Sequence, residues 1–383
     1  MVVFSPLAGL LADKYESSLM FRRTKLAELL IMAFAAGGFL LNSGLWLVVA
    51  LFAMATQSAF FSPARLAVMP KYFGTEELIR ANAYFNAGLF VSILVGLLLG
   101  GLFIAAPGGG RVVAGVLLAA SFVGWLAARL APRTATADAP ALKIDWRVPP
   151  ETVRILTAAF SAPGVARPML GLAFFYLVST HITVLTPLYA RDALGAGGTV
   201  ANAMMGLFAV GAGAGALCAA LASKRRSGFR LSGAGLGAGA AATSTVVLLT
   251  GAAAKGQAPT IAAFFETPAG LGLAASLLLS ALCMSLFIVP LQAAIQRRAP
   301  EETRARIMAA SNMLNALAAI AGAVAALLVT ETPLTTTHAF LFVAILQALV
   351  ALYMLRRRLT APAGLYDEAV FRAEDAGFSG KTS

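Results

Sequence analysis

The sequence predicts an all-α integral membrane protein made of two bundles of transmembrane helices, and three observations support this prediction. First, 59% of the 383 residues are hydrophobic and only 12% are charged, with a mean hydropathy of +0.82, which exceeds what a soluble domain carries. Second, long apolar runs alternate with short clusters of Lys and Arg. Third, the chain has only two Cys and two His, which excludes a disulfide-stapled secreted domain and a zinc ribbon.

Ten segments are long and apolar enough to be membrane helices, because about 20 apolar residues cross the hydrocarbon core. They are residues 26–42, 44–62, 85–105, 112–130, 169–190, 203–222, 231–251, 268–289, 307–329 and 339–355. Residues 1–12 are also apolar but reach only about 18 Å at about 1.5 Å per residue, so we expect the second half of a further span. A signal peptide is disfavoured, because no basic residue precedes this stretch and Asp13 and Lys14 follow it directly.

The basic residues predict the orientation of these spans. If residue 12 lies on the cytoplasmic side, all 29 Lys and Arg fall in cytoplasmic segments except Arg111, Arg191 and Lys255. We therefore expect a multi-pass protein of the cytoplasmic (inner) membrane with a cytoplasmic C-terminus. The net charge of +12 does not indicate a nucleic-acid partner, because apolar runs separate the charges instead of one solvated surface gathering them.

A drop in hydropathy divides the spans into two groups. We predict an incomplete N-terminal transmembrane bundle at 1–130, a cytoplasmic connector at 131–168, a C-terminal six-helix transmembrane bundle at 169–355 and a cytoplasmic tail at 356–383. This is a six-plus-six architecture without its first helix and half of its second. In the connector, Val153, Leu156 and Phe160 share one helical stripe and Arg154 lies on another face, which predicts an amphipathic segment on the membrane surface. A solvated linker is the alternative.

Several loop motifs resemble those of a known transporter superfamily. Residues 9–14 (Gly-Leu-Leu-Ala-Asp-Lys), followed by Arg22 and Arg23, resemble the loop between helices two and three of the major facilitator superfamily. Further stretches are similar to the lysophospholipid transporters of that superfamily and to the transporter-like half of related acyltransferase fusions. They are 61–65 (Phe-Ser-Pro-Ala-Arg), 76–82 (Glu-Glu-Leu-Ile-Arg-Ala-Asn), 93–101 and 290–315. The resemblance covers most of residues 1–358 and implies the major facilitator fold of two six-helix bundles.

The resemblance also implies a function, namely flipping of lysophospholipids across the cytoplasmic membrane for re-acylation by a separate phospholipid acyltransferase. Two alternatives stay open. One is a proton-coupled exporter of small amphipathic solutes, which is weakened because Leu97 stands where the helix-five motif of antiporters carries Pro. The other is a non-transporting membrane partner of an acyltransferase.

For a lysophospholipid the barrier to flipping is the headgroup, because the acyl chain is already favourably placed in lipid. Neutral hydrogen-bonding side chains suit a zwitterionic or singly charged headgroup, since they replace water without adding a fixed charge that must be desolvated. The candidates for this substrate path are Gln57, Asn82, Asn86, His181, Gln292, Gln296, Asn312 and Asn315.

These candidates have structural alternatives. Asn82 is expected near a helix start, where Asn frequently serves as a cap. His181 is the most deeply placed ionisable group, but a neutral imidazole bonded to a neighbouring helix explains it equally well. Glu28 lies near Lys25, so an ion pair at the membrane interface is favoured over a proton-carrying role.

A second group, Asp13, Lys14, Arg22 and Arg23, is predicted to form a cytoplasmic gate. Its carboxylate would pair with Arg side chains or a helix end in one state and release them in another. The rule that basic residues stay on the cytoplasmic side explains the two arginines without a gate, but it does not explain Asp13.

No motif indicates catalysis. The sequence has no nucleotide-binding loop, no Cys-x-x-Cys, no His-Glu-x-x-His and no Gly-x-Ser-x-Gly. We therefore predict a protein that is not an enzyme and has no cofactor and no metal site, and the scarcity of acids in the spans predicts weak or no proton coupling. Its predicted partners are a lysophospholipid or another amphipathic small molecule, membrane lipids and a phospholipid acyltransferase.

Overall fold

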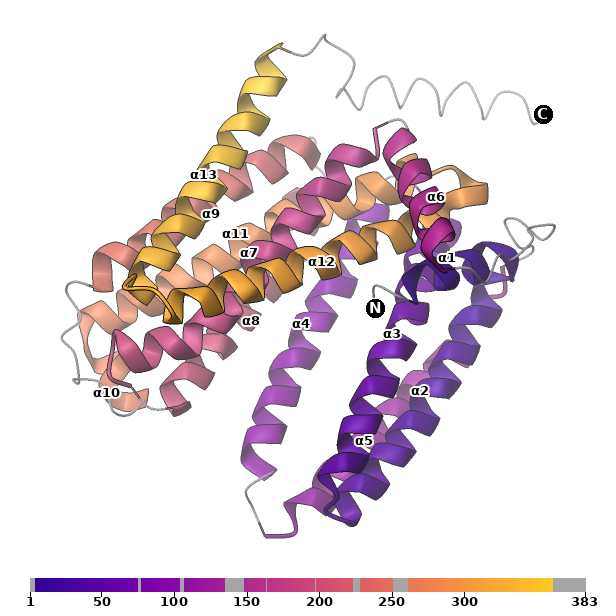
Figure 1. The fold of residues 1–383 in the computed structure, drawn as a ribbon, viewed down its shortest axis with the longest axis horizontal. Coiled ribbons are helices and arrows are strands. Elements are labelled where there is room, and N and C mark those ends of the chain that lie inside the picture. The colour runs from indigo at the N-terminus through magenta and orange to yellow at the C-terminus, as the bar shows by residue number, and fades with distance from the viewer. Residues whose placement is uncertain are drawn as a thin grey trace. The chain divides into compact units, whose positions relative to one another are not determined.

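The computed structural model describes residues 4–74, 77–103, 107–134, 148–162, 164–196, 198–222, 228–250 and 261–360. Within these ranges all regular structure is helical, which confirms the all-α prediction (Figure 1). Parts of the predicted connector and tail, residues 135–147 and 361–383, lie outside the described residues.

Nine of the described helices are long and apolar enough to cross a membrane. They are α3 (Gly44–Tyr72), α4 (Leu78–Phe103), α5 (Gly109–Leu130), α7 (Ala166–Asp192), α8 (Gly198–Ala222), α9 (Gly228–Thr250), α11 (Pro268–Arg298), α12 (Arg304–Thr330) and α13 (Thr336–Thr360). Six of them coincide with one predicted span to within five residues at each end. The other three are longer: α3 continues ten residues past the predicted end at 62, through Pro63 and Pro70, α11 continues nine residues past the predicted end at 289, and α4 begins seven residues before the predicted start at 85. The tenth predicted span, 26–42, falls on α2 (Ser17–Leu40), whose first half is charged and therefore less apolar.

Two shorter helices flank the spans of the first half of the chain. The apolar stretch at 1–12 contributes most of α1 (Ser5–Lys14), and the connector contributes α6 (Val148–Ser161), which contacts α1. In α6, Ile155 and Ala159 are buried, whereas Val153 and Phe160 are 65% and 43% exposed. The exposed side of α6 thus carries apolar side chains together with Arg154 and Thr157, and its place on the membrane stays a prediction.

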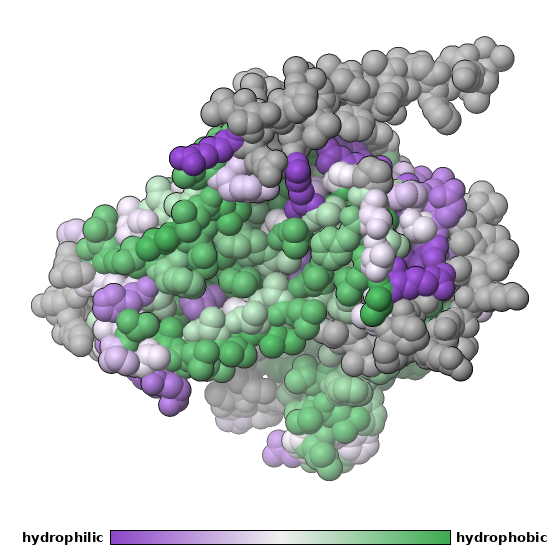
Figure 2. Space-filling model, turned by 45° about the horizontal axis from the view of Figure 1, so that its top comes forward, coloured by the Kyte–Doolittle hydropathy of each residue, from purple (hydrophilic) through white to green (hydrophobic). Residues whose placement is uncertain are grey.

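The outer surfaces of the helices are apolar as well. Leu45, Leu51, Phe52 and Leu221 are all at least 67% exposed, and Figure 2 shows hydrophobic residues over much of the face in view, with hydrophilic residues gathered in separate patches. A soluble monomer rarely exposes such continuous apolar surface, but a bilayer solvates it.

The chain forms two compact units. Unit 1 comprises Met1–Ala81, Ser92–Thr180 and Gln292–Val324, and unit 2 comprises Asn82–Val91, His181–Leu291 and Ala325–Ser383. Because these boundaries cut through helices, they do not test the predicted division at the connector. In unit 1, α2 packs along α3 and α5, and α1 packs on α3; in unit 2, α9 packs along α13 and the short α10 (Ile261–Glu266) contacts α8 (Figure 1).

Glycines bring α8 and α11 into backbone contact in unit 2. A Cβ atom at Gly211 or Gly215 would overlap the carbonyl oxygen of Leu278 or Leu282 in α11. Small residues at a spacing of four place such contacts on one face of a helix, and close approach of backbones holds membrane helices together where lipid removes the hydrophobic driving force.

Hydroxyl groups hold the other side of α11. Thr243 and Thr245 of α9 share hydrogen bonds of 2.8 and 2.6 Å with Ser280 and Ser276 of α11. Each pair of hydroxyl groups thereby gains a hydrogen-bond partner inside the membrane span, where water is absent.

We predict that Gly215→Ala destabilises the protein, because the added Cβ forces α8 and α11 apart. The expected cost is about 1–3 kcal/mol, as for overpacked cores, seen as a lower apparent melting temperature in detergent. The matched control is Gly115→Ala in α5, where a Cβ meets nothing within 4 Å and helix propensity alone should raise stability slightly. Equal melting temperatures of the two variants would refute the proposed backbone contact.

Candidate functional site

Asp13, at the cytoplasmic end of α1 in the predicted orientation, binds the start of α12. Its carboxylate accepts hydrogen bonds from the backbone amides of Ala305 at 2.8 Å and Arg306 at 3.3 Å, and from Nε of Arg306 at 2.7 Å. The Asp13 side chain is fully buried. Because the first amides of a helix have no acceptor within the helix, a carboxylate placed there satisfies them and also meets the positive end of the helix dipole.

Small residues make this contact possible. Gly9 lies one helical turn before Asp13, on the same face of α1, and a Cβ there would lie 2.7 Å from Cβ of Ala309 and 2.9 Å from Cα of Arg306. Only a glycine therefore lets α1 approach α12 closely enough for the carboxylate of Asp13 to reach the amides.

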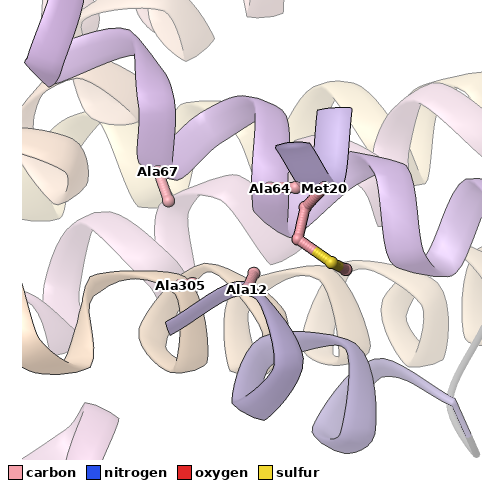
Figure 3. Packing of buried hydrophobic residues seen from close by; sticks show 5 residues of the cluster. All are labelled: Ala12, Met20, Ala64, Ala67 and Ala305. Carbon is pink, nitrogen blue, oxygen red and sulfur yellow. The ribbon is translucent and has the colours of Figure 1, made fainter. Parts of the chain in front are cut away.

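An alanine-rich cluster surrounds the contact (Figure 3). Ala12 of α1 and Ala305 of α12 pack with Ala64 and Ala67 of α3 and with Met20 of α2, and all five are buried. The Asp13 contact thus lies where four helices of unit 1 meet. We refer to the contacts of Asp13 with Ala305 and Arg306 as the Asp13 clamp.

The electrostatics of the Asp13 clamp are finely balanced. Burial raises the pKa of Asp13 to about 6, and the hydrogen bonds and charge of Arg306, with the amide of Ala305, partly oppose this rise. Arg306 also donates to the carbonyl oxygen of Glu302 at 2.9 Å. The ionised carboxylate is therefore held by its partners but disfavoured by its surroundings.

The other predicted gate residues lie elsewhere. Arg22 donates to the carbonyl oxygen of Ala131 at 2.7 Å, just beyond the end of α5, where a cation satisfies unpaired carbonyls. Arg23 is exposed and Lys14 is half-buried. Of the four residues, Asp13 alone has a described hydrogen bond to α12.

The candidates for the substrate path are mostly buried inside helices. Gln57, Asn82, Asn86, His181, Gln292, Gln296 and Asn315 are at most 8% exposed, and Asn312 is half-buried. Asn82, Asn86 and His181 belong to unit 2 and the other five to unit 1. Asn82 lies in the second turn of α4 instead of at its cap.

In unit 1, α3 carries one of these candidates and contacts two others. Its own Gln57 donates to the carbonyl oxygen of Thr24 in α2 at 3.0 Å. Asn312 of α12 donates to Oγ of Ser62 at 2.9 Å, and Nε2 of Gln296 lies 3.7 Å from Sδ of Met69. Helix α3 therefore carries polar contacts along much of its length.

Some buried polar atoms have no hydrogen-bond partner among the described residues. In α12 they include Oδ1 of Asn315 and Oγ of Ser311, which are four residues apart on one face, and in α13 they include Oε1 of Gln347. Gln347 is fully buried and was not predicted. A lone amide in the middle of the apolar run 339–355 is the signal that could have identified it.

No metal site is present in the part of the chain that the structure describes, since no three His, Cys, Asp or Glu side chains come together there.

A family model described as Major Facilitator Superfamily matches residues 1–265. No protein of curated function matches the sequence.

Among solved structures, the chain resembles a bacterial homologue of the iron transporter ferroportin in the outward-facing state, with a TM-score of 0.64 and 17% identity over 93% of this chain and 87% of that one. It also resembles the E. coli fucose:proton symporter, with a TM-score of 0.67 and 13% identity over 93% and 87% of the two chains. The human organic anion transporter MFSD10 gives a TM-score of 0.68 and 13% identity over 92% and 80%. At these identities the likeness shows a shared fold alone.

We predict that Asp13→Asn changes the pH dependence of stability. A carboxyl whose pKa rises on folding from 3.8 to about 6 destabilises the folded state as pH rises through that interval, here by up to about 3 kcal/mol. Between pH 4 and pH 7 the apparent melting temperature of the unmodified protein should therefore fall relative to that of the Asp13→Asn variant.

The control for this experiment is Asp192→Asn, which removes a carboxylate from the exposed Arg191–Asp192 pair and should give a constant offset. If the melting temperature of the unmodified protein instead rises relative to that of Asp13→Asn as pH rises, pairing with Arg306 outweighs burial. The pKa of Asp13 would then not be raised on folding.

Proposed function

Because this chain belongs to the Major Facilitator Superfamily, we propose that it flips lysophospholipids across the cytoplasmic membrane, with its C-terminus in the cytoplasm. Its family and its structural neighbours are transporters and not enzymes, as the sequence predicts. The transporter fold is therefore the premise, and the lipid substrate is the proposal.

The observation that carries the proposal is the neutrality of the buried polar side chains. In the described part of the chain, every buried polar side chain is uncharged except Asp13, which lies beyond the apolar stretch of α1. Amides, hydroxyls and an imidazole can replace water around a zwitterionic headgroup without a net charge that must itself be desolvated. The resemblance of residues 61–101 and 290–315 to lysophospholipid transporters supports a lysophospholipid as the substrate.

In this proposal the unpartnered oxygens of Ser311 and Asn315 belong to the substrate path. A buried acceptor without a partner costs about 1–3 kcal/mol, and a passing ammonium or hydroxyl group offsets that cost. The acyl chain stays in lipid throughout, since it gains nothing by leaving.

The Asp13 clamp has a separate role in the proposal. In the proposal it closes the cytoplasmic side in one state and opens in another, and the burial that raises the pKa of Asp13 to about 6 weakens the hold of the ionised carboxylate. A phospholipid acyltransferase that consumes the product would then draw flux inward without an ion gradient.

We predict that the purified protein in proteoliposomes takes up labelled lysophosphatidylethanolamine and that a protonophore leaves this uptake unchanged. The reason is that Glu28 is held in an ion pair with Lys25, and the buried polar side chains described are uncharged apart from Asp13. Uptake that collapses with the protonophore would favour proton-coupled export of amphipathic solutes. No uptake above empty liposomes would favour a non-transporting partner of an acyltransferase.

We also predict that Asn315→Leu lowers the rate of this uptake about tenfold, by removing a hydrogen bond to the headgroup worth roughly 1.5 kcal/mol. The melting temperature should stay within a few degrees, because Oδ1 of Asn315 has no described internal partner to lose. The exposed Asn202 of α8 supplies the control, since Asn202→Leu should change neither quantity. A parallel fall of melting temperature and uptake in Asn315→Leu would assign Asn315 to packing.

A further inference from the structure

A second polar cluster lies in unit 1, formed by Lys25 and Glu28 of α2 and Gln57 of α3. Nζ of Lys25 donates to both carboxylate oxygens of Glu28, at 3.0 and 2.8 Å. Nε2 of Gln57 lies 3.3 Å from Oε2 of Glu28. The carboxylate of Glu28 is therefore surrounded by donors from two helices.

An aromatic ring completes the surroundings of the Lys25 ammonium. Nζ of Lys25 lies 4.7 Å from the centroid of the Phe61 ring, and Phe61 packs on Phe21 at 5.2 Å. On the side of α5 the neighbour is Gly124, where even a Cβ would stay 3.7 Å from Nζ. A carboxylate with an aromatic face beside it is the arrangement that recognises an ammonium group.

Stability alone does not explain the Lys25–Glu28 ion pair. The pair lies at the cytoplasmic end of the predicted span 26–42, and charged groups in or beside a membrane span are costly and generally serve function. It joins two residues of the same helix, three positions apart and each 19% exposed, and only Gln57 connects it to α3. Ion pairs of this kind add little to the stability of a helix.

We infer that Lys25, Glu28 and Gln57 form a binding site for a zwitterionic headgroup that carries one ammonium and one phosphate. The ammonium of the ligand takes the place of Lys25 on Glu28 and Phe61, and Lys25 with Gln57 turns to the phosphate. The site holds no net charge before binding and none after it, so no unpaired charge is created in the low-dielectric span. The choice of a lipid headgroup rests on the proposed function.

The depth of the site fits a lipid. Gln57 follows the start of α3 at Gly44 by 13 residues, about 20 Å along the helix, and the hydrocarbon core is about 30 Å thick. Lys25 and Glu28 border the predicted start of the span at 26–42, so the site lies near the predicted cytoplasmic boundary of the core. Leu26 and Leu30 of α2 are 43% and 64% exposed, so an acyl chain can stay in the bilayer beside α2 while the headgroup binds.

Two probes and two variants test the site by equilibrium binding to the purified protein in nanodiscs. Lysophosphatidylethanolamine has both charges, and lysophosphatidylglycerol has the phosphate without the ammonium. Glu28→Gln, which keeps the shape of the side chain, should weaken binding of lysophosphatidylethanolamine about tenfold and leave lysophosphatidylglycerol within twofold. Lys25→Met should weaken binding of lysophosphatidylglycerol about tenfold. It should weaken binding of lysophosphatidylethanolamine less, because Glu28 is then free to bind the ammonium of that lipid.

This crossed pattern separates binding from damage to the fold, which would weaken both probes equally. Arg191→Met and Asp192→Asn, taken from the exposed pair of α7, are the matched controls and should leave both affinities unchanged. Equal losses for both probes, or no loss in Glu28→Gln, would overturn the site. If the crossed pattern holds but neither lipid is taken up by proteoliposomes, the site stands and the proposed function fails. If the lipids are taken up but the crossed binding pattern is absent, the proposed function stands and the proposed binding site is wrong.

Discussion

Hydrocarbon neither donates nor accepts a hydrogen bond, and this constraint governs the polar contacts of the protein. Backbone groups satisfy it by forming helices, and side chains satisfy it by pairing, as Thr243 does with Ser280 and Gln57 does with the carbonyl oxygen of Thr24. The free amides at the start of α12 satisfy it through Asp13. Oxygens that stay without a described partner, such as Oδ1 of Asn315, are informative for the same reason.

Helix α3 connects the two polar groups of unit 1. Gln57 contributes to the Lys25–Glu28 cluster, and Ala64, seven residues and about 10 Å further along the helix, packs in the cluster around the Asp13 clamp. Pro63 lies between these two places, and a proline inside a helix removes one backbone hydrogen bond and favours a bend there.

The sequence was informative about features that depend on local composition. Apolar runs identified nine described spans, and the three-residue spacing of Lys25 and Glu28 indicated their ion pair, which the structure contains. Partners distant in the chain could not be derived in this way. Asp13 and Arg306 are 293 residues apart, and the near-uniform apolarity of the spans leaves no periodicity that shows which face meets which helix. The same holds for Gln347, whose Nε2 lies 3.1 Å from Sδ of Met284, 63 residues away.

The contact surface between α1 and α12 consists of Gly9, Ala12, Ala305 and Ala309, and this composition has a consequence for how readily the helices separate. Glycine and alanine lose no rotamer freedom when they are buried. Forming the contact therefore freezes few side-chain torsions apart from those of Arg306 and Asp13. In the proposed gate, the conformational entropy of the closed and separated states would therefore differ little on this surface, and the equilibrium between them would be set by one carboxylate, its guanidinium partner and the amides of a single helical turn.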